Sequence, residues 1–122
     1  MRKLKYTAMV ALAALGLGAA VLPAQAGTKK PVKRVVDVGD YYFSPEKMTV
    51  KKDTYVIWRW PSGGGDGHDV VLRKRPKGAK KFASDVFFAD EKFRQKLTVP
   101  GTYRIVCSLH EDRMQQTIVV KR

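Results

Sequence analysis

The chain has 122 residues, the length of one domain, and its single cysteine excludes a fold held together by internal disulfides. Lys and Arg number 24 against 11 Asp and Glu, so the net charge is +13 and favours anionic partners. Only two histidines are present, which argues against an oxidase, because none would be left for an oxygen-reducing metal cluster.

Residues 1–26 predict a secretory signal peptide that is cleaved after Ala26. Three basic residues are followed by an apolar run of 16 residues, Thr7 to Leu22, and then by small residues spaced as Ala-x-Ala. An uncleaved membrane anchor is the alternative, but the run is shorter than the roughly 20 residues that span a bilayer. The mature domain, residues 27–122, would keep 21 basic and 11 acidic residues, a net charge of +10. We therefore expect an extracytoplasmic protein, in a periplasm or outside the cell, without a transmembrane segment in its mature chain.

Short runs of β-branched and aromatic residues, separated by Gly, Pro and Asp, predict strands along the rest of the chain. The predicted strands are 34–38, 41–43, 48–51, 54–60, 68–72, 92–99, 102–107 and 114–120. Residues 27–33 are expected to fray, and residues 83–90 to include a short helical turn. Seven or eight short strands without helical periodicity predict one all-β sandwich.

The strand predicted at 54–60 shows the clearest alternation. Val56, Trp58 and Trp60 share one face by the two-residue period, and we expect that face to pack into the core. A glycine-rich loop, 61–67, follows the strand. It lacks the lysine and the following helix of a phosphate-binding loop, so its glycines are expected to let the backbone approach a neighbouring site closely.

Residues 73–81 form a basic run, with six Lys or Arg in nine positions. Pro76 and Gly78 interrupt it, which indicates a loop or a loosely paired edge. Two interpretations stay open from the sequence: a solvated surface loop, or a docking patch for an acidic partner.

The candidate metal ligands gather around the last predicted strands. Cys107 ends the strand 102–107, His110 and Met114 follow it closely, and His68 opens the strand 68–72. Each residue alone has an ordinary explanation, such as an inert buried cysteine or a core methionine. Together, a thiolate, two imidazoles and a weak axial thioether are the ligands of a blue copper site that transfers electrons. Zinc is a weaker alternative, with Asp69 or Asp112 as a further ligand.

The chain also resembles the cupredoxins, and among them the plastocyanin and amicyanin group, over nearly all of residues 27–122. The pattern that carries the resemblance is Val56-x-Trp58, His68-x-Val70, Gly101-Thr102-Tyr103, Cys107-x-x-His110 and Met114. The resemblance implies a Greek-key β-sandwich, one type 1 copper that cycles between Cu(I) and Cu(II), and one-electron transfer. By matching position it assigns the copper to His68, Cys107, His110 and Met114.

Two departures from the family pattern lie close to the predicted ligands. Three residues separate His110 from Met114, where the resembling families usually have two or four. Asp69 stands where those families commonly have Asn. We expect the Asp69 carboxylate to accept a hydrogen bond from the backbone or the hydroxyl of Ser108, and so to support the ligands from the second shell.

These features predict an electron carrier and not an enzyme. We expect the exposed edge of His110 to pass the electron, an acidic redox partner protein to be recruited by the positive charge, and the protein to act as a monomer. Copper capture or delivery by the same four ligands, without a redox partner, is one alternative. A polyanion-binding module that uses residues 73–81 is another, but it leaves the ligand spacing unexplained, and no specific nucleic acid is expected.

Overall fold

The structure, a computed structural model, describes residues 29–122, so the predicted signal peptide and its cleavage site lie outside the described residues. Pro31–Arg122 form one compact unit. Its strands are β1 (Lys33–Gly39), β2 (Tyr42–Ser44), β3 (Lys47–Lys51), β4 (Thr54–Trp60), β5 (Val71–Lys74), β6 (Glu91–Leu97), β7 (Gly101–Val106) and β8 (Gln115–Lys121). The all-β prediction is confirmed. The part of the chain that the structure describes contains no helix able to cross a membrane.

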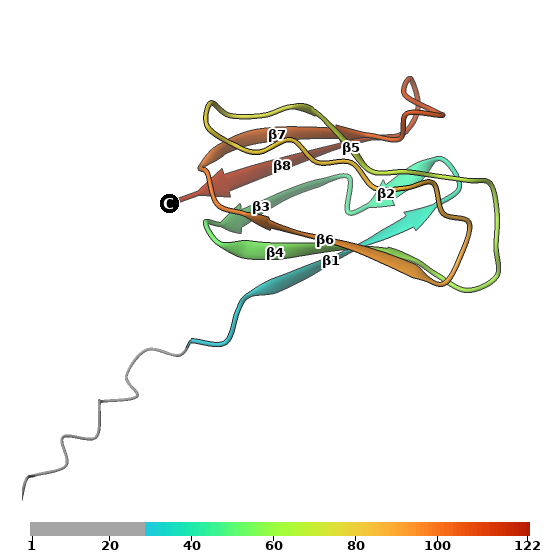
Figure 1. Ribbon diagram of the computed structural model, residues 1–122, viewed down its shortest axis with the longest axis horizontal. Coiled ribbons are helices and arrows are strands. Elements are labelled where there is room, and N and C mark those ends of the chain that lie inside the picture. The colour runs from blue at the N-terminus through green and yellow to red at the C-terminus, as the bar shows by residue number, and fades with distance from the viewer. Residues whose placement is uncertain (1–28) are drawn as a thin grey trace, which may run out of the picture. The chain divides into compact units, whose positions relative to one another are not determined.

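The eight strands form two four-stranded sheets, which Figure 1 shows as two layers. One sheet has the order β2-β1-β4-β6 and the other the order β3-β8-β7-β5. The pairs β1–β4 and β3–β8 are parallel, and the other neighbours are antiparallel. Successive strands such as β2 and β3, or β6 and β7, lie in different sheets, so the chain crosses repeatedly between the layers. This is the sandwich expected from the sequence.

The core lies between the two sheets and contains the face of β4 predicted from its alternation. Val56, Trp58 and Trp60 are all buried there, while Arg59 faces solvent. The Trp58 indole Nε1 donates to the side-chain oxygen of Gln116 at 2.8 Å, and this bond joins β4 in one sheet to β8 in the other. This core tryptophan therefore also links the two layers.

The helical turn predicted within residues 83–90 is wrong. The backbone N–H of Ser84 donates to the carbonyl of Val70 at 2.9 Å, and that of Phe87 donates to the carbonyl of His68 at 3.0 Å. Both N–H groups donate to carbonyls of the segment 68–71 and not to carbonyls within residues 83–90. Residues 83–90 therefore lie extended beside the segment 68–71. The same pairing delays the regular strand predicted at 68–72, which begins only at Val71.

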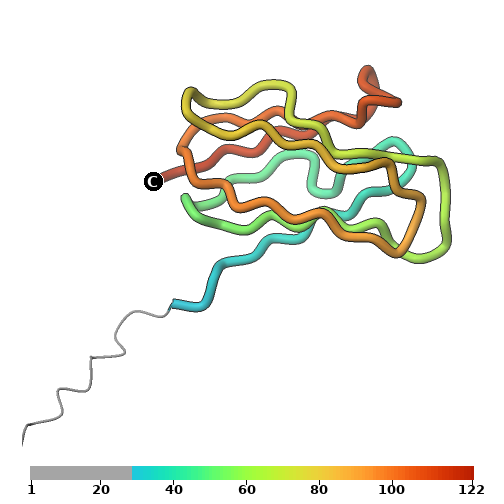
Figure 2. The backbone as a smooth tube through the Cα atoms, in the orientation of Figure 1, coloured from blue at the N-terminus to red at the C-terminus, as the bar shows by residue number. Residues whose placement is uncertain are grey.

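Loops that are far apart in sequence meet at one end of the sandwich. Figure 2 shows the glycine-rich loop 61–67, in green to yellow, and the loop after β7, in orange to red, at the end away from the C-terminus. Predicted ligands lie in or directly after these two loops. The fold therefore brings the two halves of the predicted site to the same edge of the molecule.

Candidate metal centre

The loop from Cys107 to Met114 is closed by its own backbone. The Cys107 N–H donates to the Met114 carbonyl at 3.0 Å, which brings the two ends of the loop together. Inside it, the His110 N–H donates to the Cys107 carbonyl at 3.1 Å, and the Met114 N–H donates to the His110 carbonyl at 2.9 Å. The three residues between His110 and Met114 therefore form one α-turn, closed by an i to i+4 bond. The unusual spacing noted in the sequence has a regular local structure.

The backbone of His68 is held by three hydrogen bonds from two different elements. Its N–H and its carbonyl both pair with Phe87, each at 3.0 Å. The carbonyl also accepts the indole Nε1–H of Trp60 at 3.2 Å. Trp60 is thus more than a core residue, because it fixes the position from which the imidazole of His68 projects.

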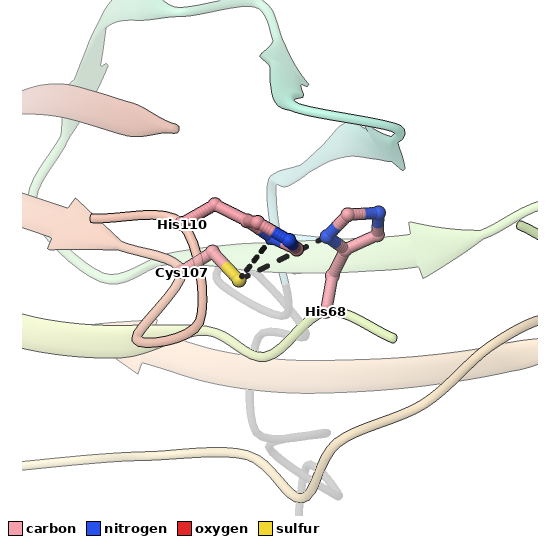
Figure 3. Close-up of side chains that lie close together, drawn as sticks. All are labelled: His68, Cys107 and His110. Atoms are coloured by element: carbon pink, nitrogen blue, oxygen red, sulfur yellow. Dashed lines mark hydrogen bonds between the residues drawn. The ribbon is translucent and has the colours of Figure 1, made fainter. Parts of the chain in front are cut away.

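Three of the predicted ligands converge on one point. The Cys107 Sγ lies 3.8 Å from His68 Nδ1 and 3.5 Å from His110 Nδ1. The one sulfur and two nitrogens all lie within 4.8 Å of one another. Figure 3 shows both rings directed at the sulfur. His68 and Cys107 are buried, whereas His110 is half-buried. Two imidazole nitrogens and a shielded sulfur this close together suit a soft transition metal such as copper.

Met114, the fourth predicted ligand, is next to this cluster and wholly buried. Its carbonyl bonds to the N–H of Cys107, so the two residues are neighbours across the mouth of the loop. The donor set of two nitrogens and two sulfurs fits copper better than zinc, since a closed zinc site prefers thiolate, imidazole or carboxylate to a thioether.

Asp69 connects the two segments that carry the ligands. One of its carboxylate oxygens accepts the backbone N–H of Ser108 at 2.6 Å, and the other accepts the Ser108 hydroxyl at 2.5 Å. Asp69 directly follows His68, and Ser108 directly follows Cys107. The sequence led us to expect a hydrogen bond from either the backbone or the hydroxyl of Ser108, and the structure contains both.

Sequence reasoning missed a second group of residues beside the site. The carboxylate oxygen Oδ1 of Asp40 lies 2.9 Å from Nε2 of His68. The ring of Tyr41 stands edge-on to the ring of His110, with 4.8 Å between the centroids. The guanidinium of Arg113 lies 4.2 Å from the centroid of the Tyr41 ring. Tyr41 also donates its hydroxyl to Asp66. No local motif marks Asp40 and Tyr41, because only the folded β1–β2 turn brings them to the histidines.

The electrostatics of the site depend first on burial. Loss of solvent raises the pKa of the Cys107 thiol, an effect partly offset by nearby backbone N–H groups. The hydrogen bond from His68, and then that from the backbone of Asp66, hold the pKa of Asp40 below its usual range. At neutral pH the cysteine is therefore a thiol in the metal-free protein, and Asp40 is a carboxylate.

We expect copper binding to release the proton of Cys107. A thiol with a raised pKa stays protonated between pH 7 and 8.5, and the metal binds the thiolate, so the apparent affinity should increase about tenfold for each pH unit in this range. Competitive titration with a chelator of known affinity at several pH values measures the slope. A pH-independent affinity in wild type, equal to that of Cys107→Ser, would show that the thiol does not bind.

Replacing Asp69 with alanine should weaken copper binding by about 10–100-fold. The substitution removes both bonds to Ser108 and frees the two ligand segments to separate, and loss of such outer partners typically costs this much. Asp85→Ala removes an equal charge from an exposed position and is the control. Equal affinities of the two variants, measured by chelator competition, would exclude this role for Asp69.

The comparisons with known proteins agree with the copper site that the geometry indicates. The family described as copper binding proteins, plastocyanin/azurin family, matches residues 30–121. Plastocyanin of Dryopteris crassirhizoma is 29% identical over 97 residues, which cover 70% of this chain and 93% of that protein.

Solved structures share the sandwich. The reduced Cu(I) form of a mutant amicyanin superposes with a TM-score of 0.62 at 21% identity, covering 79% of this chain and 87% of that one. A copper-containing nitrite reductase from Thermus scotoductus matches with a TM-score of 0.60 at 25% identity over 75% of this chain. This chain spans only 22% of the length of that reductase, so the match concerns one part of it.

Proposed function

The chain belongs to the plastocyanin/azurin family of copper-binding proteins, the cupredoxins, and from that membership we propose that it is an extracytoplasmic carrier of single electrons. The observation that carries the proposal is the meeting of His68, Cys107 and His110 at one end of a rigid sandwich. We assign one copper ion to these three residues together with Met114. An extracytoplasmic location follows from the signal peptide proposed for residues 1–26.

Each proposed ligand has a distinct task. Cys107 gives up its proton and offers a soft sulfur, while His68 and His110 offer the lone pairs of their Nδ1 atoms. The buried thioether of Met114 supplies a weak fourth ligand. A copper ion held by this set supplies a centre that gains and loses one electron. Because backbone hydrogen bonds hold His68 against Phe87 and Cys107 against Met114, the ligands need little rearrangement between the two states.

A carrier fits the chain better than an enzyme. Both histidines and the only cysteine of the sequence serve as ligands in this proposal, so none of them is left as a catalytic base or nucleophile. The half-buried His110 is the proposed exit for the electron, because its ring lies against that of Tyr41 and the preceding residue, Leu109, is exposed. A redox partner would therefore approach the end of the sandwich where the ligand loop lies.

The proposed partner is an acidic protein. All six basic side chains of the run 73–81 are exposed, as the docking interpretation requires. The run begins beside the ligand loop, where Arg73 Nε lies 2.8 Å from the carboxylate of Glu111, the residue after His110, and it then leads along β7 to its other end, where Pro76 lies against Gly101. The positive charge of the run would speed encounter with an acidic surface, while the contact with the proposed exit is made by Arg73 alone.

Protein-film voltammetry of the copper-loaded protein tests the carrier function. A reversible one-electron wave that persists over many cycles is the expected result, because the ligands are preorganised for both oxidation states. Loss of copper on reduction, or transfer of copper to an acceptor protein in preference to electron transfer, would instead support copper capture or delivery.

Salt should slow electron transfer to an acidic partner. We expect the second-order rate constant with an acidic redox protein to fall at least about tenfold between low ionic strength and 0.5 M salt, because screening removes the steering by exposed lysines. Stopped-flow kinetics measures this. Replacing Lys74, Lys77, Lys80 and Lys81 together with glutamine should flatten the salt dependence, and a rate that is insensitive to salt in wild type would contradict the steering.

A further inference from the structure

The buried ligand histidine has a carboxylate partner on its far side. Nδ1 of His68 faces the Cys107 sulfur, and the opposite nitrogen, Nε2, lies 2.9 Å from Oδ1 of Asp40. The His68 side chain is 2% exposed, whereas that of Asp40 is 51% exposed. The contact therefore connects a buried ring to a surface carboxylate supplied by the turn between β1 and β2.

The carboxylate of Asp40 is itself held in place by the glycine-rich loop. The same oxygen, Oδ1, accepts the backbone N–H of Asp66 at 3.0 Å. A Cβ on Gly65 would lie 2.6 Å from that oxygen, closer than real contacts allow, so only glycine lets the loop approach here. Tyr41 donates its hydroxyl to Asp66 and ties the turn to the loop a second time. The close backbone approach expected from the glycines is made to this carboxylate.

The chemistry of the contact fixes the form of the imidazole. A carboxylate only accepts hydrogen bonds, so Nε2 of His68 carries the proton, and in the neutral ring that binds a metal Nδ1 then holds the lone pair. The lone pair then points to the side where Cys107 lies. Hydrogen bonding to a carboxylate also makes the imidazole a better electron donor, and a better donor stabilises the higher positive charge of Cu(II) more than that of Cu(I).

We propose that Asp40 is a positioning residue for the copper ligand His68, which it holds in the Nε2–H form while lowering the reduction potential of the site. The inference rests on the proposed function, because it concerns a ligand of the same copper. It adds a residue that neither the sequence motif nor the ligand cluster contains. It also assigns a role to the glycine-rich loop, which holds the Asp40 carboxylate against His68.

Two substitutions of Asp40 separate its charge from its hydrogen bond. Asp40→Asn keeps an oxygen that can accept the Nε2–H but removes the negative charge, and Asp40→Ala removes both. The control is Asp37→Asn, on strand β1 just before the turn that carries Asp40, because its carboxylate pairs with Arg59 instead of a ligand. The control changes the net charge of the protein by the same amount.

In Asp40→Asn the preference of the site for Cu(II) over Cu(I) should fall about 10–100-fold. This corresponds to a rise in reduction potential of about 60–120 mV. Asp37→Asn should shift the potential by less than a third of that value. Nitrogen NMR of the metal-free full chain reports the tautomer of His68. We expect the Nε2–H form in wild type and in Asp40→Asn, and a mixture of the two forms in Asp40→Ala.

Gly65→Ala tests the role of the loop without touching the carboxylate. The new methyl group would displace the Asp40 side chain, so the potential should rise toward that of Asp40→Asn. Gly64→Asn is the control, because a side chain there meets nothing within 4 Å and asparagine tolerates its positive φ of 67°.

The outcomes distinguish the inference from the function on which it rests. A wild-type protein that binds no copper would overturn both. A wild-type blue copper site whose potential is the same in Asp40→Asn and Asp37→Asn would overturn the inference alone. A His68 tautomer unchanged in Asp40→Ala would likewise show that this carboxylate does not hold the ring.

Discussion

Cys107→Ser will abolish the intense visible absorption of the copper-loaded protein. That absorption arises from charge transfer between a thiolate sulfur and Cu(II), and the chain has no other cysteine to supply it. We also expect the affinity for copper to fall by more than the roughly 10–100-fold that loss of an outer-shell partner costs, because a direct ligand is removed. Visible spectra during titration with Cu(II), wild type against variant, measure both effects.

The comparison needs evidence that the variant is folded, because Cys107 is fully buried. Far-ultraviolet circular dichroism of both proteins without metal supplies this. His110→Ala provides a second test at a half-buried position, where a structural penalty is smaller. A folded Cys107→Ser protein that keeps the intense band would refute the assignment of the thiolate.

Trp58→Ala will lower the free energy of unfolding by about 3–5 kcal/mol, a large part of the roughly 5–15 kcal/mol that a domain of this size has. Trp58 is completely buried, and its ring lies 5.7 Å from that of Phe82 and 5.9 Å from that of Phe93. The substitution opens a cavity at this cluster. It also leaves the buried oxygen of Gln116 without its 2.8 Å hydrogen bond.

Urea denaturation of the metal-free protein, followed by circular dichroism, measures the loss. Trp58→Phe should be milder, because most of the ring volume stays and chiefly the hydrogen bond is lost. Phe88→Ala, at a ring that is 64% exposed, is the control and should cost about 1 kcal/mol or less. Equal stability of Trp58→Ala and wild type would mean that Trp58 does not join the two sheets.

The parts of the site that lie within one loop could be predicted from the sequence. Cys107 follows a strand directly, and His110 and Met114 come within seven residues of it, so their meeting needs only local turns. His68 was predicted from its residue type, but its distance of 39 residues from Cys107 could be closed only by the sandwich. The alternation of β4 likewise predicted its buried face.

The rest depended on contacts between distant segments. Asp40 reaches His68 because β1 pairs in parallel with β4, and no local pattern announces a parallel pair. The segment 83–90 contains residues compatible with a helical turn, but its backbone bonds to residues 68–71 instead. In both cases tertiary hydrogen bonding outweighed the local preferences that sequence patterns report.

X-ray absorption spectroscopy at the copper edge of the loaded wild-type protein tests the central claim most directly. We predict one short copper–sulfur distance together with two imidazole nitrogens, as the convergence of Cys107, His68 and His110 requires. A first shell made only of nitrogen and oxygen atoms, without a short sulfur contact, would contradict the account.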